Sequence, residues 1–375
     1  MKVVTAIDSF KGSMTSMEAG FAAAEGIHRV DADAEVQVRP LADGGEGTVE
    51  ALVAGMNGKT EHVKVTGPLG EPVICEYGII ESTKTAVIEM AGAAGITQVP
   101  DEKRNPLYTT TYGVGEVIKD AIEKGCRRFI VGIGGSATND GGVGMLQALG
   151  YAFLDKDGKQ VLPGARGLKD ITEITAAYVI PELAECKFRV ACDVTNPLCG
   201  ELGCSSIYGP QKGATPEMIQ DMDQWLGAYA ELAKERFPKA DAKYPGTGAA
   251  GGMGFAFLTF TDAVLESGIN IVLDETKLED YIKDADLVIT GEGRMDGQTA
   301  MGKAPIGVAK LAKKHHAKVI AFAGSVTKEA AACNKEGIDA FFPILRNVCT
   351  LAEAMDPATA KNNMTATAEQ VFRLL

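Results

Sequence analysis

Short β-branched runs alternate with longer helix-forming segments near the start of the chain. Small polar residues and glycines separate the two kinds of segment, which is the pattern of successive strands and helices. Thr15 and Glu18 have the spacing of a capping box, in which each side chain bonds a backbone N–H at the helix start. The predicted elements are the strands Val3–Ile7 and Glu35–Leu41 and the helices Thr15–Val30 and Thr48–Met56.

The same alternation returns near the end of the chain. The predicted elements there are the strands Asp286–Thr290, Lys318–Ala323 and Ala340–Pro343 and the helices Lys303–His315, Glu329–Glu336 and Ala366–Leu374. Two strand–helix units at the start and three at the end fit one doubly wound, parallel, five-stranded sheet. The predicted fold class is therefore α/β, with one sheet built from both ends of the chain.

The middle of the chain has a different pattern, because Pro and Gly punctuate its first strands. The predicted elements are the strands Val63–Thr66, Val73–Ile80, Thr85–Met90, Arg128–Ile133 and Arg189–Cys192 and the helices Val143–Leu149 and Pro216–Arg236. This pattern predicts a second α/β domain with a mixed sheet, inserted into the first. The predicted domains are residues 1–64 plus 284–375 and residues 65–283, with an active site in the cleft between them.

Composition narrows the function. The chain carries 50 acidic and 37 basic residues and a net charge of −13, which argues against bulk binding of nucleic acid or an anionic membrane. Eight cysteines without a C-x-x-C pair and only four histidines argue against a zinc site and favour reduced thiols. We find no signal segment and no apolar run long enough to span a membrane. These features predict a soluble, cytoplasmic protein.

Glycine is the unusual component, at 44 of 375 residues or roughly 12% against a usual ~7%. Many of these glycines follow predicted strands, together with acids, hydroxyls and single cations. In an open parallel sheet ligands bind beyond the carboxyl ends of the strands, and these residue types suit a phosphate and a divalent metal. Ordinary turns also use Asp and Gly, but several such loops together favour a site. The loops are Asp8–Ser13, Asp43–Gly47, Gly291–Asp296 and Gly324–Ser325, with Arg346 nearby.

The inserted domain adds further glycine loops. The segment Gly132–Gly142 is the strongest candidate for an anion loop, since it joins a predicted strand to a predicted helix and contains hydroxyls. The spacings that begin at Gly132 and Gly246 also fit the looser dinucleotide-binding pattern, which keeps an NAD-linked oxidoreductase as an alternative. The segment Gly297–Lys303 approaches a Walker A loop, but Ala304 stands where a hydroxyl would bind Mg²⁺.

Taken together, these segments resemble the bacterial two-domain glycerate kinases of the glycerate 2-kinase type. The matching segments are Asp8–Ser13, Pro40–Thr48, Gly132–Gly142, Asp193–Leu198, Gly209–Ala214, Gly248–Gly252, Thr290–Thr299 and Gly302–Lys303. They occur in the expected order along the whole chain. The resemblance implies a CheY-like sheet and ATP- and Mg²⁺-dependent phosphorylation of D-glycerate, with release of ADP. It favours 2-phosphoglycerate as the product.

Phosphoryl transfer needs a base, cations for the phosphates and hard oxygen ligands for the metal, and the chain offers candidates for each. Asp193 is the preferred base and Asp8 the second choice, while Lys11 is expected to bridge phosphate oxygens. Lys212 and Arg294 compete for the glycerate carboxylate. The predicted Mg²⁺ ligands are Asp43, Glu46 and Asp296. The predicted substrate- or phosphate-binding residues are Ser9, Lys212, Arg294, Gly134, Gly135, Ser136, Thr138, Asn139 and Glu292.

Other functions fit the same residues. A non-catalytic anion sensor could use the same kind of sheet, and a kinase of a related small sugar acid or ketose is the nearest rival within the class. The expected partners are D-glycerate and ATP, with no nucleic acid and no membrane, and the expected state is a monomer or a homodimer.

Overall fold

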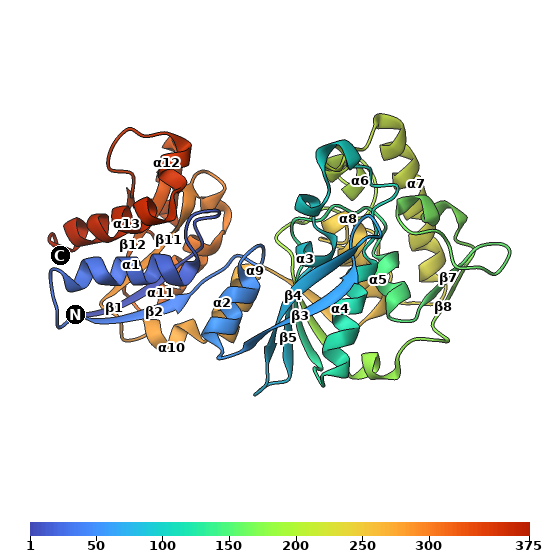
Figure 1. The fold of residues 1–375 in the computed structure, drawn as a ribbon, viewed down its shortest axis with the longest axis horizontal. Helices are drawn as coiled ribbons and strands as arrows, with labels where there is room; N and C mark the ends of the chain where they lie inside the picture. Colours follow the sequence, from blue (N-terminus) through green and yellow to red (C-terminus); the bar gives the residue numbers. More distant parts are fainter. The chain divides into compact units, whose positions relative to one another are not determined.

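The two ends of the chain form one parallel sheet, as predicted. The computed structural model describes residues 1–375, and Figure 1 shows its elements in sequence colours. The sheet contains β1 (Lys2–Ile7), β2 (Glu35–Pro40), β11 (Leu287–Met295), β12 (Lys318–Val326) and β13 (Ala340–Pro343). Their order is β13-β12-β11-β1-β2, and every neighbouring pair is parallel. This is the doubly wound order of CheY-like folds, so the predicted fold class is confirmed.

Helices pack on this sheet. On one side α1 (Ser16–His28) packs on β1 and β2 and along α13 (Pro357–Phe372), while α11 (Ala304–Lys314) packs on β11 and β12. Thr15 caps α1, and both hydrogen bonds of the predicted capping box with Glu18 are present. The remaining helices of this region are α2 (Thr48–Gly55), α9 (Gly268–Glu275), α10 (Leu278–Ile282), α12 (Leu351–Met355) and the 3-10 helices Thr299–Met301 and Lys328–Glu336.

Strands β11 and β12 are longer than the sequence predicts. The predicted loop Gly291–Asp296 is mostly strand, because the backbone pairing continues from Glu292 opposite Ala323 to Met295 opposite Val326. A Cβ atom at Gly291 would overlap the Phe322 carbonyl, so a glycine is required for this close pairing. Since side chains on a strand alternate between its two faces, Glu292 and Arg294 lie on the same face.

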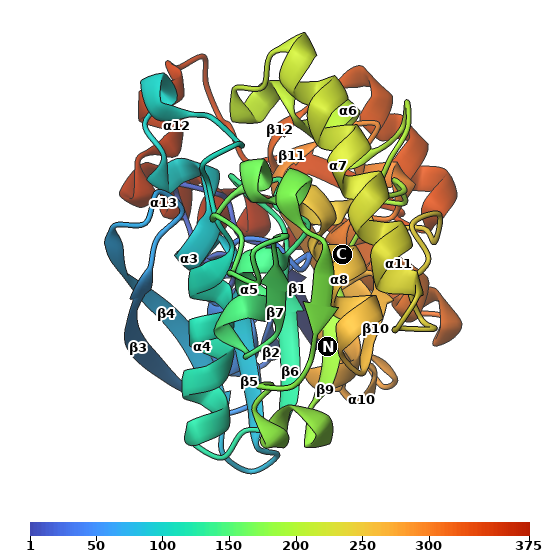
Figure 2. The ribbon, with the colours of Figure 1, turned by 90° about the vertical axis from the view of Figure 1, so that its right-hand side faces the viewer.

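The middle of the chain forms a second, mixed sheet, as predicted. It has six strands in the order β10-β9-β6-β5-β4-β3, and Figure 2 shows most of them side by side. The strands β5, β6, β9 and β10 are parallel, and β3 and β4 are antiparallel additions. Their bounds are β3 (Lys59–Thr66), β4 (Pro72–Ile80), β5 (Thr85–Glu89), β6 (Arg128–Gly132), β9 (Lys187–Ala191) and β10 (Ala263–Glu266); β7 (Ala152–Leu154) and β8 (Glu173–Thr175) form a separate pair.

The two longest helices of this part that the sequence analysis does not predict are α4 (Tyr112–Glu123) and α8 (Ala249–Phe260). The apolar residues of α4 recur at helical spacing and are buried, whereas α8 is apolar all round and lies inside the core. The other helices are α3 (Ala91–Ala94), α5 (Val143–Ala148), α6 (Cys204–Tyr208), α7 (Pro216–Lys234) and the 3-10 helices Ile96–Gln98, Asp101–Lys103, Ala165–Asp170, Pro181–Glu185 and Pro210–Lys212.

The chain divides into two units. The first contains Met1–Asp43, Glu50–Asn57 and Ile269–Leu375, and the second contains Gly44–Val49 and Gly58–Gly268. These bounds differ from the sequence-based ones at both ends of the insertion. Strand β3 pairs with β4 in the second sheet, while the segment that contains α9 and α10 has its contacts with the first unit.

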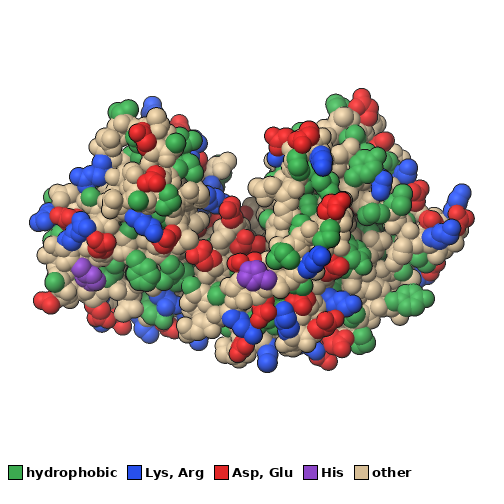
Figure 3. All heavy atoms as spheres, in the orientation of Figure 1, with side chains coloured by type: hydrophobic (Ala, Val, Ile, Leu, Met, Phe, Trp, Pro, Cys, Tyr) green, Lys and Arg blue, Asp and Glu red, His purple; other side chains and the backbone are tan.

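Acidic and basic side chains are mixed on the surface shown in Figure 3. On the face shown in Figure 3, Lys and Arg side chains are interspersed with Asp and Glu and form no broad basic area. None of the helices combines the length and the apolar character that crossing a membrane requires. All eight cysteines are free thiols.

Candidate active site

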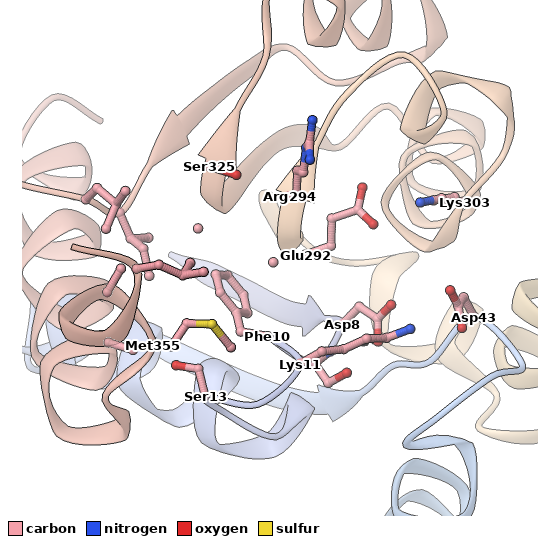
Figure 4. Close-up of a pocket in the computed structure, with 18 residues that line it drawn as sticks. Asp8, Phe10, Lys11, Ser13, Asp43, Glu292, Arg294, Lys303, Ser325 and Met355 are labelled. Carbon is pink, nitrogen blue, oxygen red and sulfur yellow. Dashed lines mark hydrogen bonds between the residues drawn. The ribbon is translucent and has the colours of Figure 1, made fainter. Parts of the chain in front are cut away.

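A pocket of about 450 Å³ lies at the carboxyl ends of the strands of the first unit. In this sheet the strand order reverses between β1 and β11, and such a switch point is where open α/β sheets bind ligands. Residues from β11, β12, α12 and the segments that follow β1, β2 and β13 line the pocket (Figure 4). The lining includes Asp8, Ser9, Lys11, Asp43, Glu292 and Arg294, all of which are predicted site residues.

The loop after β1 is held in place by the sheet and by α1. Asp8 N–H donates to the Gly291 carbonyl over 2.9 Å, which ties the start of the loop to β11. The Ser16 hydroxyl donates to the Ile7 carbonyl (2.6 Å) and accepts from Leu41 N–H (2.8 Å), so it links β1 and β2 behind the loop. Gly12 has φ +76°, a conformation that favours glycine. This loop therefore presents its side chains from a fixed backbone.

Three carboxyl groups face one another in the pocket. Asp8 is only 4% exposed, and burial together with the nearby charges of Asp43 and Glu292 raises its pKa to about 7. Its Oδ1 accepts a 2.7 Å hydrogen bond from Ser9 N–H. Burial also raises the pKa of Glu292, whose carboxylate accepts a 2.5 Å hydrogen bond from the Thr299 hydroxyl. The region is a partly desolvated cluster of negative charge.

Three cationic side chains line the same pocket: Lys11, Arg294 and Lys303. The charge of Lys11 acts on Asp8 and that of Lys303 acts on Glu292, and each lowers the pKa of its carboxyl against the effect of burial. In Figure 4 the Lys11 side chain extends past Asp8 towards Asp43. The cations therefore share the pocket with the acids and are placed to bind an anion there.

The structure groups the acids differently from the predicted metal set of Asp43, Glu46 and Asp296. Asp296 does not line the pocket; its Oδ1 accepts from Gln298 N–H (2.8 Å) and Thr299 N–H (3.4 Å) and so holds a turn. Glu46 belongs to the second unit, where its charge acts on Glu89. No three His, Cys, Asp or Glu residues are arranged as a ready-made metal site.

The opposite wall of the pocket is apolar and was not predicted from the sequence. Phe10 and Ile344 are buried there, whereas Leu345, Leu351 and Met355 remain partly exposed. Leu351 and Met355 belong to α12, whose start is capped reciprocally by Thr350 and Glu353. The spacing of Thr350 and Glu353 is a capping-box signal that could have located this helix in the sequence.

The predicted anion loop of the second unit follows β6, at the carboxyl end of the parallel strands. Gly134 and Gly135 are exposed, and Gly135 has φ +73°. Ser136 is 7% exposed, while Thr138 and Asn139 are fully buried. The Asn139 amide donates to the Ser205 hydroxyl over 2.8 Å, so it holds the loop from behind. Within the predicted loop, the exposed residues are therefore Gly134 and Gly135.

Lys212 also lies behind this loop. Its ammonium donates to the Ser136 hydroxyl oxygen (2.8 Å) and the Thr138 carbonyl (2.6 Å), and the side chain is 2% exposed. Burial lowers the pKa of Lys212 to about 8. Asp140 lies nearby and accepts from the backbone and hydroxyl of Thr111, each over 2.9 Å. Lys212 therefore braces the loop from behind.

Other acids lie at the same end of the second sheet. Asp193 follows β9, is exposed, and its Oδ1 accepts from Gly268 N–H over 3.2 Å. Glu89 ends β5 and accepts from Val49 N–H over 2.8 Å, and burial raises its pKa. Glu89 was not predicted as a site residue, although a carboxylate at the end of a predicted buried strand is a recognisable signal. The second unit therefore has its own strand-end cluster.

The arrangement of a CheY-like sheet, an inserted mixed domain and polar strand ends has known relatives. The sequence profile described as the glycerate kinase family matches residues 3–375. The chain belongs to the glycerate kinase family. A glycerate kinase from Haemophilus influenzae is 49% identical over 100% of this chain and 99% of its own length, and a glycerate 2-kinase from Escherichia coli is 48% identical over 98% of both.

A solved structure has the same fold over the whole chain. A crystal structure described as glycerate kinase 2 from Salmonella typhimurium LT2 superposes with a TM-score of 0.92 at 46% identity, and the match covers 100% of this chain and 98% of that one. The whole architecture of this glycerate kinase family member, including the insertion, is therefore shared with that protein.

Proposed function

We propose that this protein transfers the γ-phosphoryl group of ATP to D-glycerate and releases ADP and phosphoglycerate. The observation that carries the proposal is the pocket at the switch point of the first sheet, where three cations and three carboxyls meet in a member of the glycerate kinase family. The relatives named glycerate kinase and glycerate 2-kinase support the acceptor, and the second name favours 2-phosphoglycerate.

The cations suit the phosphates. Phosphoryl transfer depends on positioning and on stabilising negative charge on the transferring group. We assign this role to Lys11, Arg294 and Lys303, which line one pocket. The exposed backbone of Gly134 and Gly135 is a second place where an anionic group can approach N–H donors.

The carboxyls fit a Mg²⁺ ion. Asp43 and Glu292 each raise the pKa of Asp8, and a cation among these groups would relieve their repulsion. Mg²⁺ in kinase sites is usually bound by one or two carboxylates together with phosphates and water, so a three-acid cage is not needed. We assign Asp43 and Glu292 as its ligands. When bound, the ion neutralises phosphate charge and orients the phosphates.

The acceptor hydroxyl must lose its proton as its oxygen bonds to the γ-phosphorus and the bond from that phosphorus to the ADP oxygen breaks. Asp8 is our candidate for accepting this proton, because it is a buried carboxyl with a pKa of about 7 in the same pocket as the cations. Asp193, which lies at the strand ends of the second unit, is the rival candidate.

The function is tested by incubating the purified protein with ATP, Mg²⁺ and D-glycerate. We expect ADP to form only when glycerate is present, and ³¹P NMR to identify 2-phosphoglycerate. Formation of 3-phosphoglycerate would correct the position of transfer. ATP that stays intact in the presence of glycerate, or NADH formation from glycerate and NAD without ATP, would refute the proposal.

A further inference from the structure

The pocket of the first unit is larger than a three-carbon acid needs. Its volume of about 450 Å³ lies within the ~300–1,000 Å³ typical of pockets for drug-sized ligands. Every residue that lines it belongs to the first unit, so the pocket is complete within one body of the structure. Its natural occupant is therefore the larger of the two proposed substrates.

The two ends of this pocket differ in chemistry. Figure 4 shows Met355 and Phe10 towards one end and Lys11, Asp43 and Lys303 towards the other. The apolar end is completed by Ile344, Leu345, Leu351 and Ala354. A ligand that fits both ends combines a flat apolar ring with a polyanion, as a nucleoside triphosphate does.

Exposed apolar side chains mark where the ring would lie. Leu351 is 75% exposed although it lines the pocket, and Leu345 and Met355 are 36% and 37% exposed. The wall is also held close to the loop after β1, because a Cβ atom at Gly12 would lie 2.8 Å from Met355 Cε. Covering these side chains with a heterocycle removes apolar surface from water, which favours binding. A glycerate molecule has no apolar part to gain from them.

We infer that the wall formed by Phe10, Leu345, Leu351 and Met355 is the seat for the adenine base of ATP, with the triphosphate directed towards Lys11, Arg294 and Lys303. This inference rests on the proposed function and adds where and in which direction the phosphoryl donor binds. The first unit would then bind ATP entirely through its own residues and would hold the adenine base by apolar contacts.

The experiment compares ATP with inorganic tripolyphosphate by calorimetric titration of the full chain, in wild type and in Leu351→Ala. Leu351 is mostly exposed, so its truncation leaves the fold intact. Val348→Ala is the matched control, because Val348 is fully exposed on the segment before α12 but does not line the pocket. We expect Leu351→Ala to weaken ATP binding roughly five- to tenfold and leave tripolyphosphate binding unchanged. Val348→Ala should change neither.

Steady-state kinetics provide the second readout. The KM for ATP should rise in Leu351→Ala, while the KM for D-glycerate stays at the wild-type value. The inference is overturned if ATP binds no more tightly than tripolyphosphate to the wild type. It is also overturned if Leu351→Ala raises the KM for glycerate with ATP binding unchanged, since the pocket would then belong to the acceptor.

Failure of the proposed function is seen separately. The titrations measure binding without turnover, so an ATP affinity that depends on Leu351 supports the adenine seat even in a protein that fails to phosphorylate glycerate. If the protein phosphorylates glycerate and Leu351→Ala binds ATP as tightly as the wild type, the proposed function stands and the adenine site proposed here is wrong.

Discussion

The strand ends of the two units contain the same kinds of residue and use them in different ways. In the first unit Lys11, Asp43 and Glu292 line an open pocket, and their charges face one another across it. In the second unit Lys212 is buried behind the loop that contains Ser136, and its ammonium makes two hydrogen bonds to that loop. The type of residue therefore indicates a polar strand end, but the contacts of each side chain decide whether it lines a pocket or supports a loop.

The largest expected effect comes from Asp8→Asn. Loss of a general base costs about 10²–10⁴-fold in rate, so kcat should fall by that much while the variant stays folded. Because the wild-type carboxyl is buried near Asp43 and Glu292, removing its charge should raise the melting temperature at pH 8. Steady-state kinetics and thermal unfolding check both parts. Asp193→Asn is the matched variant, and near-normal kcat in Asp8→Asn with loss in Asp193→Asn would assign the base to the second unit.

Lys11→Met should have the next largest effect on activity. The ammonium is placed to stabilise charge on the transferring phosphoryl group, and loss of one such donor costs about 10²–10³-fold in kcat. The control is Lys314→Met, which removes an exposed lysine at the end of α11, outside the pocket. Equal kcat in the two variants would show that Lys11 is a solvated surface residue.

Lys212→Met tests whether the buried lysine of the second unit stabilises the fold. Methionine fills a similar volume but leaves Ser136 and the Thr138 carbonyl without their donor, so we expect a loss of about 1–3 kcal/mol in the free energy of unfolding near pH 7. The measurement is denaturant unfolding with glycerate kinetics in parallel. An unchanged stability with a raised KM for glycerate would instead make Lys212 a direct ligand of the carboxylate.

The pH dependence of stability in the wild type and in Lys212→Met gives a sharper test. The pKa of Lys212 is about 8 in the folded protein and 10.5 without burial, so between these values the unfolded chain binds more protons. Stability that is due to this group therefore rises with pH from about 8 to about 10.5, by at most about 3 kcal/mol. The advantage of the wild type over Lys212→Met should grow over this range. A constant difference would mean that the lysine titrates as an exposed one.

The smallest expected effect is that of Thr350→Ala. The variant removes the cap of α12, which contributes about 1 kcal/mol to helix stability, and α12 carries Leu351 and Met355 of the apolar wall. We expect ATP binding to weaken a few-fold and global stability to change little. Thr350→Ser keeps the hydroxyl and should bind ATP like the wild type. Equal ATP affinity in Thr350→Ala and Thr350→Ser would show that the helix cap does not affect ATP binding in the pocket.

Much of the fold could be predicted from the sequence because local patterns carry it. The five strands of the first sheet were predicted from short runs of β-branched and other apolar residues, and the start of α1 from the spacing of Thr15 and Glu18. The continuation of β11 through Gly291 was missed because glycine usually marks a turn. The signal that reverses this interpretation is pairing with β12, a segment well separated from it along the chain. The propensities of the residues in one segment do not show which distant segment it will pair with.

The site shows the same division. Asp8, Lys11, Asp43, Glu292 and Arg294 were predicted because acids, cations and glycines after parallel strands are typical of a ligand-binding edge, and they line one pocket. The predicted metal set combined Asp43, which lines the pocket, with Asp296, whose carboxylate accepts backbone hydrogen bonds in a turn. The apolar wall was not predicted, because the spacing of Leu351 and Met355 indicates at most a short helix and does not show that the helix packs beside the loop after β1. Which of these side chains share a pocket depends on distances that only the folded sheet creates.

The amino-acid sequence alone was enough to predict the class of fold, the mixed character of the inserted sheet and the family to which the chain belongs. Periodicity, capping and glycine loops are local features, so they can be recognised in the sequence alone. The burial of Lys212 behind a loop and the position of Lys11 in a pocket became apparent in the folded protein. Burial and side-chain contacts depend on segments that are far apart in the chain, and these segments meet only once both sheets have formed.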